Sequence, residues 1–167
     1  LRFSGVKNIY NELDSLGEIP LPPYIERAEL RDEDRERYQT VYAQTAGSVA
    51  APTAGLHFTN ELLEKIKARG VKICYVTLHV GLGTFAPVKT ETLAAHTMHE
   101  ERFEVSEATA RAVNQAKAER RRVIAVGTTT VRVLENVAAQ HGGVIVPGSG
   151  RTKIFIYPPY DFRVVDA

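Results

Sequence analysis

Three histidine-containing segments combine side chains that could carry out acid/base chemistry. His57 comes just before a predicted helix start, where exposed backbone N–H groups favour anions. His79 ends a β-rich run, and ligands of α/β proteins bind outside the carboxyl ends of strands. His96 and His99 lie close to Glu101. Because histidine titrates near neutral pH, these residues predict polar acid/base groups. A tight turn with a structural histidine and a hydrogen-bonded structural cluster are the alternatives.

Small and hydroxyl-bearing residues occur in the same loops. Gly81 and Gly83 form a Gly-x-Gly after the β-rich run, but the third glycine of a dinucleotide-binding loop is absent. Small residues at 53–55 let the backbone approach another segment or a ligand closely. Three threonines at 128–130 lie at a strand-to-helix turn that could hold a carboxylate or a phosphate, and Arg132 could add a bidentate clamp. Capping explains one threonine well and three poorly.

A metal site is the alternative for the histidines, and we predict none. His96 and His99 are spaced i, i+3, whereas the zincin pattern needs i, i+4 with the glutamate between. Zinc would also need a third protein ligand, which His57 or His79 could supply. A metal-dependent hydrolase built on these histidines is therefore kept as a second hypothesis.

Alternating helical and β-rich patterns must position these loops. Cys74, in an apolar context, is expected to be a buried residue of a strand. Alternation over most of the chain predicts the α/β class, with a mixed sheet or barrel-like arrangement and flanking helices. The periodicity predicts helices within 6–16, 31–45, 59–70, 106–120 and 127–137, strands at 71–80, 123–126 and 154–157, and a loop at 142–150.

Composition is that of an ordinary globular domain. The net charge of +1 over 167 residues gives no global attraction to nucleic acid, so any RNA contact needs a local basic patch. Arg120–Arg122 and the arginines between 27 and 37 are candidates, with a solvated helix as the alternative for both. The single cysteine, the lack of a long apolar run and the lack of a signal-peptide pattern predict a cytoplasmic protein.

Short motifs follow one another along the chain, at 21–25 (LPPYI), 34–42 (DRERYQTVY), 50–58 (AAPTAGLHF), 76–85 (VTLHVGLGTF), His96 with Met98, His99 and Glu101, 123–129 (VIAVGTT) and 156–158 (IYP). In this order they resemble the motifs of one family, the S-adenosylmethionine:tRNA ribosyltransferase-isomerases of queuosine biosynthesis. The resemblance implies an α/β catalytic domain whose inserted β-barrel domain is almost entirely absent here. It places residues 1–17 in the exit from that inserted domain and 18–167 in the catalytic domain. We accordingly expect an internal fragment that is inactive by itself.

The resemblance also implies a reaction. The ribosyl group of S-adenosylmethionine moves onto 7-aminomethyl-7-deazaguanine in tRNA, giving epoxyqueuosine-tRNA, adenine and methionine. The implied partners are S-adenosylmethionine, as co-substrate without a further cofactor, and a tRNA with a queuosine-type anticodon; a monomer is expected. A non-catalytic RNA-binding fragment is the remaining alternative. The implied catalytic residues are His79, His99, His57 and Glu101, and the implied substrate-binding residues are Thr53, Gly55, Gly81, Gly83, Thr84, Thr128, Thr129 and Arg132.

Overall fold

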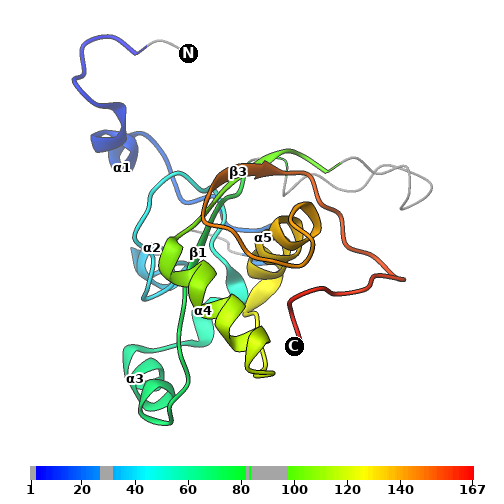
Figure 1. Ribbon diagram of the computed structural model, residues 1–167. Coiled ribbons are helices and arrows are strands. Elements are labelled where there is room, and N and C mark those ends of the chain that lie inside the picture. Colours follow the sequence, from blue (N-terminus) through cyan, green and yellow to red (C-terminus); the bar gives the residue numbers. More distant parts are fainter. Residues whose placement is uncertain (1–2, 27–31, 82, 84–97) are drawn as a thin grey trace.

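A small antiparallel sheet organises the computed structural model, which describes residues 3–26, 32–81, 83 and 98–167 (Figure 1). The strands β1 (Val76–His79), β2 (Glu101–Val105) and β3 (Gly148–Thr152) lie in the order β1-β2-β3. Both strand pairs are antiparallel, with His79 opposite Arg102 and Glu101 opposite Thr152. The α/β class is confirmed, and in the described part of the sheet each pairing is antiparallel.

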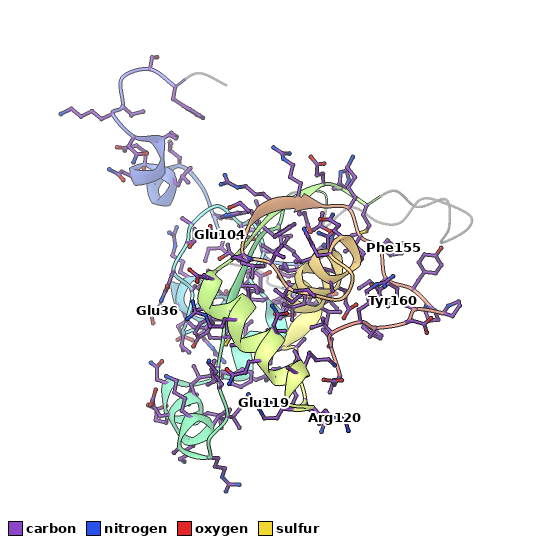
Figure 2. The ribbon with its side chains drawn as sticks, viewed as in Figure 1. Glu36, Glu104, Glu119, Arg120, Phe155 and Tyr160 are labelled. Atoms are coloured by element: carbon purple, nitrogen blue, oxygen red, sulfur yellow. The ribbon has the colours of Figure 1, made fainter. Side chains whose placement is uncertain are left out.

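One face of the sheet carries the hydrophobic core. Side chains of β2 alternate between buried and exposed, and Phe103 and Val105 lie on the buried face. Leu78 of β1 is directly opposite Phe103 and joins the same core. Glu104 of β2 is exposed on the opposite face (Figure 2). The alternation therefore directs Glu101, with the same parity as Phe103, to the core side.

Two amphipathic helices, α4 (Glu107–Ala118) and α5 (Gly127–Gln140), cover the buried face. Ser106 caps α4, because its Oγ accepts a hydrogen bond from the Thr109 backbone N–H at 3.2 Å. Thr109 Oγ1 in turn donates to the Tyr75 carbonyl at 2.8 Å and ties α4 to the segment before β1. After α4 the backbone turns through Arg120, at a φ of 56° that L-residues seldom adopt (Figure 2).

A buried carboxylate fixes the C-terminal segment against α5. Glu135 has no exposed surface and accepts backbone N–H groups of Arg163, Val164 and Val165 at 2.9–3.0 Å. The Tyr160 hydroxyl also donates to this carboxylate, at 3.4 Å. Hydrogen bonds to an ionised acceptor are stronger than neutral ones, which suits a carboxylate with four donors. Glu135 is thereby a structural anchor for residues 163–165.

Shorter elements complete the described chain. Thr59 caps α3 (Asn60–Ala68), since its side chain accepts from the Leu62 N–H. Figure 1 shows α1 projecting from the rest of the molecule, and its Leu16 is 68% exposed. Of the helices that the structure describes, none has both the length and the apolar character needed to cross a membrane. The remaining elements are η1 (Ile9–Asn11), α1 (Leu13–Leu16), α2 (Asp32–Arg37) and η2 (Thr53–His57).

Several predicted elements are shorter than expected or wrong. The strand expected at 71–80 covers only Val76–His79, and Cys74 is exposed before it rather than buried in it. Residues 123–126 and 154–157 form no strand. The first of these segments is still paired with the C-terminal residues, since the Asp166 N–H donates to the Val123 carbonyl at 2.9 Å. The pattern at 6–16 yields only η1 and α1, and that at 31–45 only α2. The division at residue 17 stays a prediction.

The strand β3 lies in a segment expected to be a loop, and β2 was not predicted at all. Gly148, Ser149 and Gly150 disfavour strands, but a side chain at Gly150 would approach Phe103 Cζ to 2.6 Å. The Phe103 ring thus occupies the space that a β-former would need. In β2 the charged Glu101 points inward, and this breaks the apolar alternation by which a strand is recognised.

Candidate active site

Segment 46–50 runs beside β1 and brings His79 against Gly47. The Val49 N–H donates to the Val80 carbonyl at 3.0 Å, and the Val80 N–H donates to Ser48 Oγ at 3.1 Å. A Cβ at Gly47 would lie 2.9 Å from His79 Nδ1, and the φ of 127° at this position also favours glycine. The glycine therefore lets the backbone pack directly on the imidazole. Sequence analysis did not identify Gly47, since its partner lies 32 residues away.

The loop 52–58 meets the start of α5. A Cβ at Gly127 would lie 3.4 Å from Ala54 Cβ, so η2 and the turn that opens α5 are in contact. The three threonines of this turn have different surroundings. Thr130 Oγ1 donates to the Val126 carbonyl at 2.9 Å, Thr128 is exposed, and Thr129 lines a cavity. Thr130 is thus used inside the helix, which leaves Thr128 and Thr129 as the candidates for a ligand.

Within η2, the three predicted site residues also differ. Thr53 and His57 are exposed, whereas Gly55 between them is buried. A side chain at Gly55 would overlap the Tyr42 hydroxyl and lie 2.9 Å from Thr40 Cγ2. Gly55 is therefore required by the close approach of a tyrosine.

Glu101 and Arg132 form an ion pair between β2 and α5. Arg132 Nη1 donates to Glu101 Oε2, and Arg132 Nε donates to the Ile154 carbonyl at 3.3 Å. The Glu101 side chain is 4% exposed and that of Arg132 is 15% exposed. Within the described residues, the buried Arg132 Nη2 has no hydrogen-bond partner. Glu101 thus orients a guanidinium, and the Arg132 fork keeps one unused donor group.

His99 lies against Gly83 at the end of the loop after β1. A side chain at Gly83 would overlap the His99 ring, which is exposed to solvent. Gly81 has open space around the position of a Cβ. Thr84 and His96, both part of the predicted site, lie outside the described residues. In the described part of the chain, no three His, Cys, Asp or Glu side chains gather as metal ligands would.

A cavity of about 290 Å³ opens where segment 38–52, the start of β1 and the start of α5 meet. Gly47 and Thr129 connect it with the predicted loops. Sequence analysis missed the roles of its three tyrosines, because Tyr38 and Tyr42 indicated only one face of the helix predicted within 31–45, and Tyr75 only a residue of the strand predicted at 71–80. Burial raises the pKa of Tyr42, and Tyr75 adds to that effect. The phenol is therefore neutral at physiological pH.

Segment 46–50, the loop after β1, the residues before β2 and the start of α5 therefore come together around the end of β1. His79, Gly47, Thr129, Gly83 and His99 join that region, while Thr53 and His57 stay on the exposed side of η2. Glu101 and Arg132 lie between the sheet and α5, where their ion pair joins β2 to the helix. Nothing in this geometry tests the individual roles, which stay predictions.

Comparison with known proteins gives the family. A solved structure that resembles this chain is that of S-adenosylmethionine tRNA ribosyltransferase from Thermotoga maritima, at 39% sequence identity and a TM-score of 0.49. The match covers 68% of this chain and 33% of that one, so the chain spans about a third of that protein's length. The sequence profile of the queuosine biosynthesis protein family matches residues 1–167. The chain therefore belongs to the queuosine biosynthesis protein family.

Proposed function

We propose that the protein carrying this chain is an S-adenosylmethionine-dependent tRNA ribosyltransferase-isomerase. It transfers the ribosyl group of S-adenosylmethionine to 7-aminomethyl-7-deazaguanine in tRNA and rearranges it, so that epoxyqueuosine-tRNA, adenine and methionine are formed. Membership of the queuosine biosynthesis family over the whole chain supports this proposal. The observation that carries it is the convergence of the histidine, glycine and threonine loops at the end of β1, with His79 packed on Gly47.

The chemistry requires a base and then an acid. The sulfonium of S-adenosylmethionine makes the adjacent C5′ proton removable, and departing adenine must receive a proton. His79 is our candidate for the base, because its imidazole is half-buried and packs on Gly47, which itself lines the cavity. His99 and His57 are exposed and are the candidates for proton exchange with the leaving group and solvent.

Arg132 is our candidate for the methionine carboxylate. Arg132 belongs to the second turn of α5, a helix whose N-terminus favours an anion, and its Nη2 is unpaired within the described residues. Glu101 then acts as a positioning residue that holds the fork in place. Thr128 and Thr129 would donate to the same carboxylate from the first turn of α5. For the ribose we propose close backbone packing at Gly55, Gly81 and Gly83, with hydroxyls from Thr53 and Thr84.

The partners follow from the reaction. They are a tRNA with a queuosine-type anticodon and S-adenosylmethionine as co-substrate, with no further cofactor and no metal. We propose a monomer that acts in the cytoplasm, where its tRNA substrate is found. Residues 18–167 belong in this account to the catalytic domain, and residues 1–17 to the exit from the inserted domain.

Adenine release tests the proposal. The intact protein is incubated with S-adenosylmethionine and a tRNA that carries 7-aminomethyl-7-deazaguanine, and adenine is followed by chromatography. We expect release only with both substrates, and none when the tRNA carries guanine at that position. No adenine from a folded protein with both substrates present would refute the function.

A further inference from the structure

The cavity next to His79, which we call the tyrosine cavity, has walls suited to a neutral ring. Its volume of about 290 Å³ is at the lower end of ligand pockets, which measure roughly 300–1,000 Å³. Among the described residues that line it, none carries a formal charge. A phosphate or carboxylate would find no counter-charge there, so the walls favour an uncharged group. The polar lining residues include Gln39, Thr40, Thr77 and Thr129.

One wall holds a buried donor without an acceptor. Tyr38 is 8% exposed, and within the described residues its O–H meets no acceptor, although the Ala51 backbone N–H approaches the phenol oxygen. Burial raises the pKa of Tyr38, and the Ala51 N–H only partly offsets this, so the phenol keeps its proton. A buried O–H without an acceptor is costly and calls for an explanation. A ligand with a ring acceptor would provide the missing partner.

A second wall offers an aromatic surface. The rings of Tyr42 and Tyr75 are 5.4 Å apart between centroids and tilted by 39°. Tyr42 is held in place by Gly55, whereas Tyr75 is 46% exposed and keeps ring surface free for stacking. Nucleobases stack on such rings, since each base has a π-face.

We propose that the tyrosine cavity binds a fused bicyclic nucleobase, with Tyr38 Oη donating to a ring acceptor and Tyr75 stacking on the ring. This inference rests on the proposed function, whose two substrates each bring such a base: the adenine of S-adenosylmethionine and the 7-deazaguanine of the tRNA. Thr129 connects the cavity to the start of α5, and Gly47 connects it to His79. Gly47 thus lies between the bound base and His79, the proposed acid/base group.

Tyr38→Phe in the intact protein tests the hydrogen bond. Calorimetric titration with S-adenosylhomocysteine probes the adenine arm. A second titration uses an anticodon stem-loop carrying 7-aminomethyl-7-deazaguanine, compared with the same stem-loop carrying guanine. We expect about three- to tenfold weaker binding in one of the two titrations, because Tyr38→Phe removes one neutral hydrogen bond to the base. The thermal stability of the ligand-free variant stays equal or rises, because the unpaired donor is gone.

Tyr75 tests the stacking surface separately. Tyr75→Phe keeps the ring and should bind as the wild type does, whereas Tyr75→Ala should weaken the same arm by about tenfold or more. Tyr157→Phe is the matched control, because it removes a hydroxyl from a tyrosine that is not among the cavity residues. It should leave both titrations unchanged.

The outcomes separate this inference from the proposed function. Weaker binding of S-adenosylhomocysteine identifies adenine as the bound base, and weaker binding of the modified stem-loop identifies the deazaguanine. Unchanged binding in both arms, or a loss of stability in Tyr38→Phe that matches the loss of affinity, would overturn the proposal. If the variants show these binding effects but the wild-type protein releases no adenine, the proposed function is refuted and the cavity assignment still holds.

Discussion

Arg132 on α5 and Glu101 on β2 form a buried ion pair across 31 residues of sequence. Breaking such a pair leaves an uncompensated charge, which costs more than the pair itself contributes. The pair therefore determines both the packing of α5 on the sheet and the orientation of the Arg132 fork. It also shows that Glu101, which the family resemblance implies as a catalytic residue, contacts a guanidinium.

Glu101→Gln should lower the free energy of unfolding by about 3 kcal/mol, because Arg132 then stays buried without its counter-charge. Denaturant titration measures this. The control is Glu64→Gln, which removes an exposed partner of Lys67 and should change stability by less than about 0.5 kcal/mol. In the double variant with Arg132→Gln, much of the loss should be recovered. Equal losses of unfolding free energy in Glu101→Gln and Glu64→Gln would argue against a buried pair.

Gly83→Ala should displace the His99 ring, whose position a new methyl group would overlap. We expect a loss of about 1–3 kcal/mol in stability, together with shifted His99 imidazole resonances in NMR spectra. Gly81→Ala is the matched change in the same loop, because a methyl group there meets open space. That variant should leave the His99 resonances in place. If both variants behave alike, the contact between Gly83 and His99 is not present in solution.

The stability supplied by Asp166 should depend on pH. The Val123 backbone N–H, followed by the Lys117 ammonium, lowers the pKa of Asp166 below its ordinary 3.8. Since the folded pKa is depressed, the stabilisation is complete above about pH 4 and disappears as pH falls through the folded value. Because Asp166 is exposed and solvent screens its interactions, Asp166→Asn should cost less than about 1 kcal/mol at pH 7 and progressively less in acid. Asp161→Asn, an exposed change on the same segment, should show no such trend in denaturant titrations at different pH.

His79→Asn should lower turnover by about 100-fold or more if His79 is the base. Asparagine keeps a polar side chain but has no group that titrates near neutral pH. The control is His141→Asn at the end of α5, far from the loops in sequence, where Nδ1 lies 2.9 Å from the Val137 carbonyl oxygen. It should retain activity. Unchanged turnover in His79→Asn, with the fold intact by circular dichroism, would remove His79 from the mechanism.

Local signals predicted the helices better than the sheet. Thr59 and Ser106 are good N-caps before amphipathic patterns, and α3 and α4 begin directly after them. The strand β3 carries no such signal, because its glycine-rich sequence is favoured only by pairing with β2 and by the Phe103 ring. Strand pairing and packing are tertiary effects that override local propensity.

For the candidate site, the sequence indicated the loops but not the contacts between them. The histidine, glycine and threonine segments were found from residue type and spacing. Their convergence depends on the pairing of 46–50 with Val80, and the contact of Gly47 with His79 follows from it. The tyrosine cavity was missed because Tyr38 and Tyr42 at helical spacing indicate a core face and Tyr75 indicates a strand, and only folding shows that the three enclose space.

The fate of the ribosyl group in the reaction decides whether the protein is a ribosyltransferase. The intact protein is given S-adenosylmethionine labelled either in the ribose or in the methyl group, together with the tRNA that carries 7-aminomethyl-7-deazaguanine. We expect one ribose label in the tRNA for each adenine released, and no methyl label. Methyl label in the tRNA, or adenine release without ribose label in the tRNA, would contradict the proposed function.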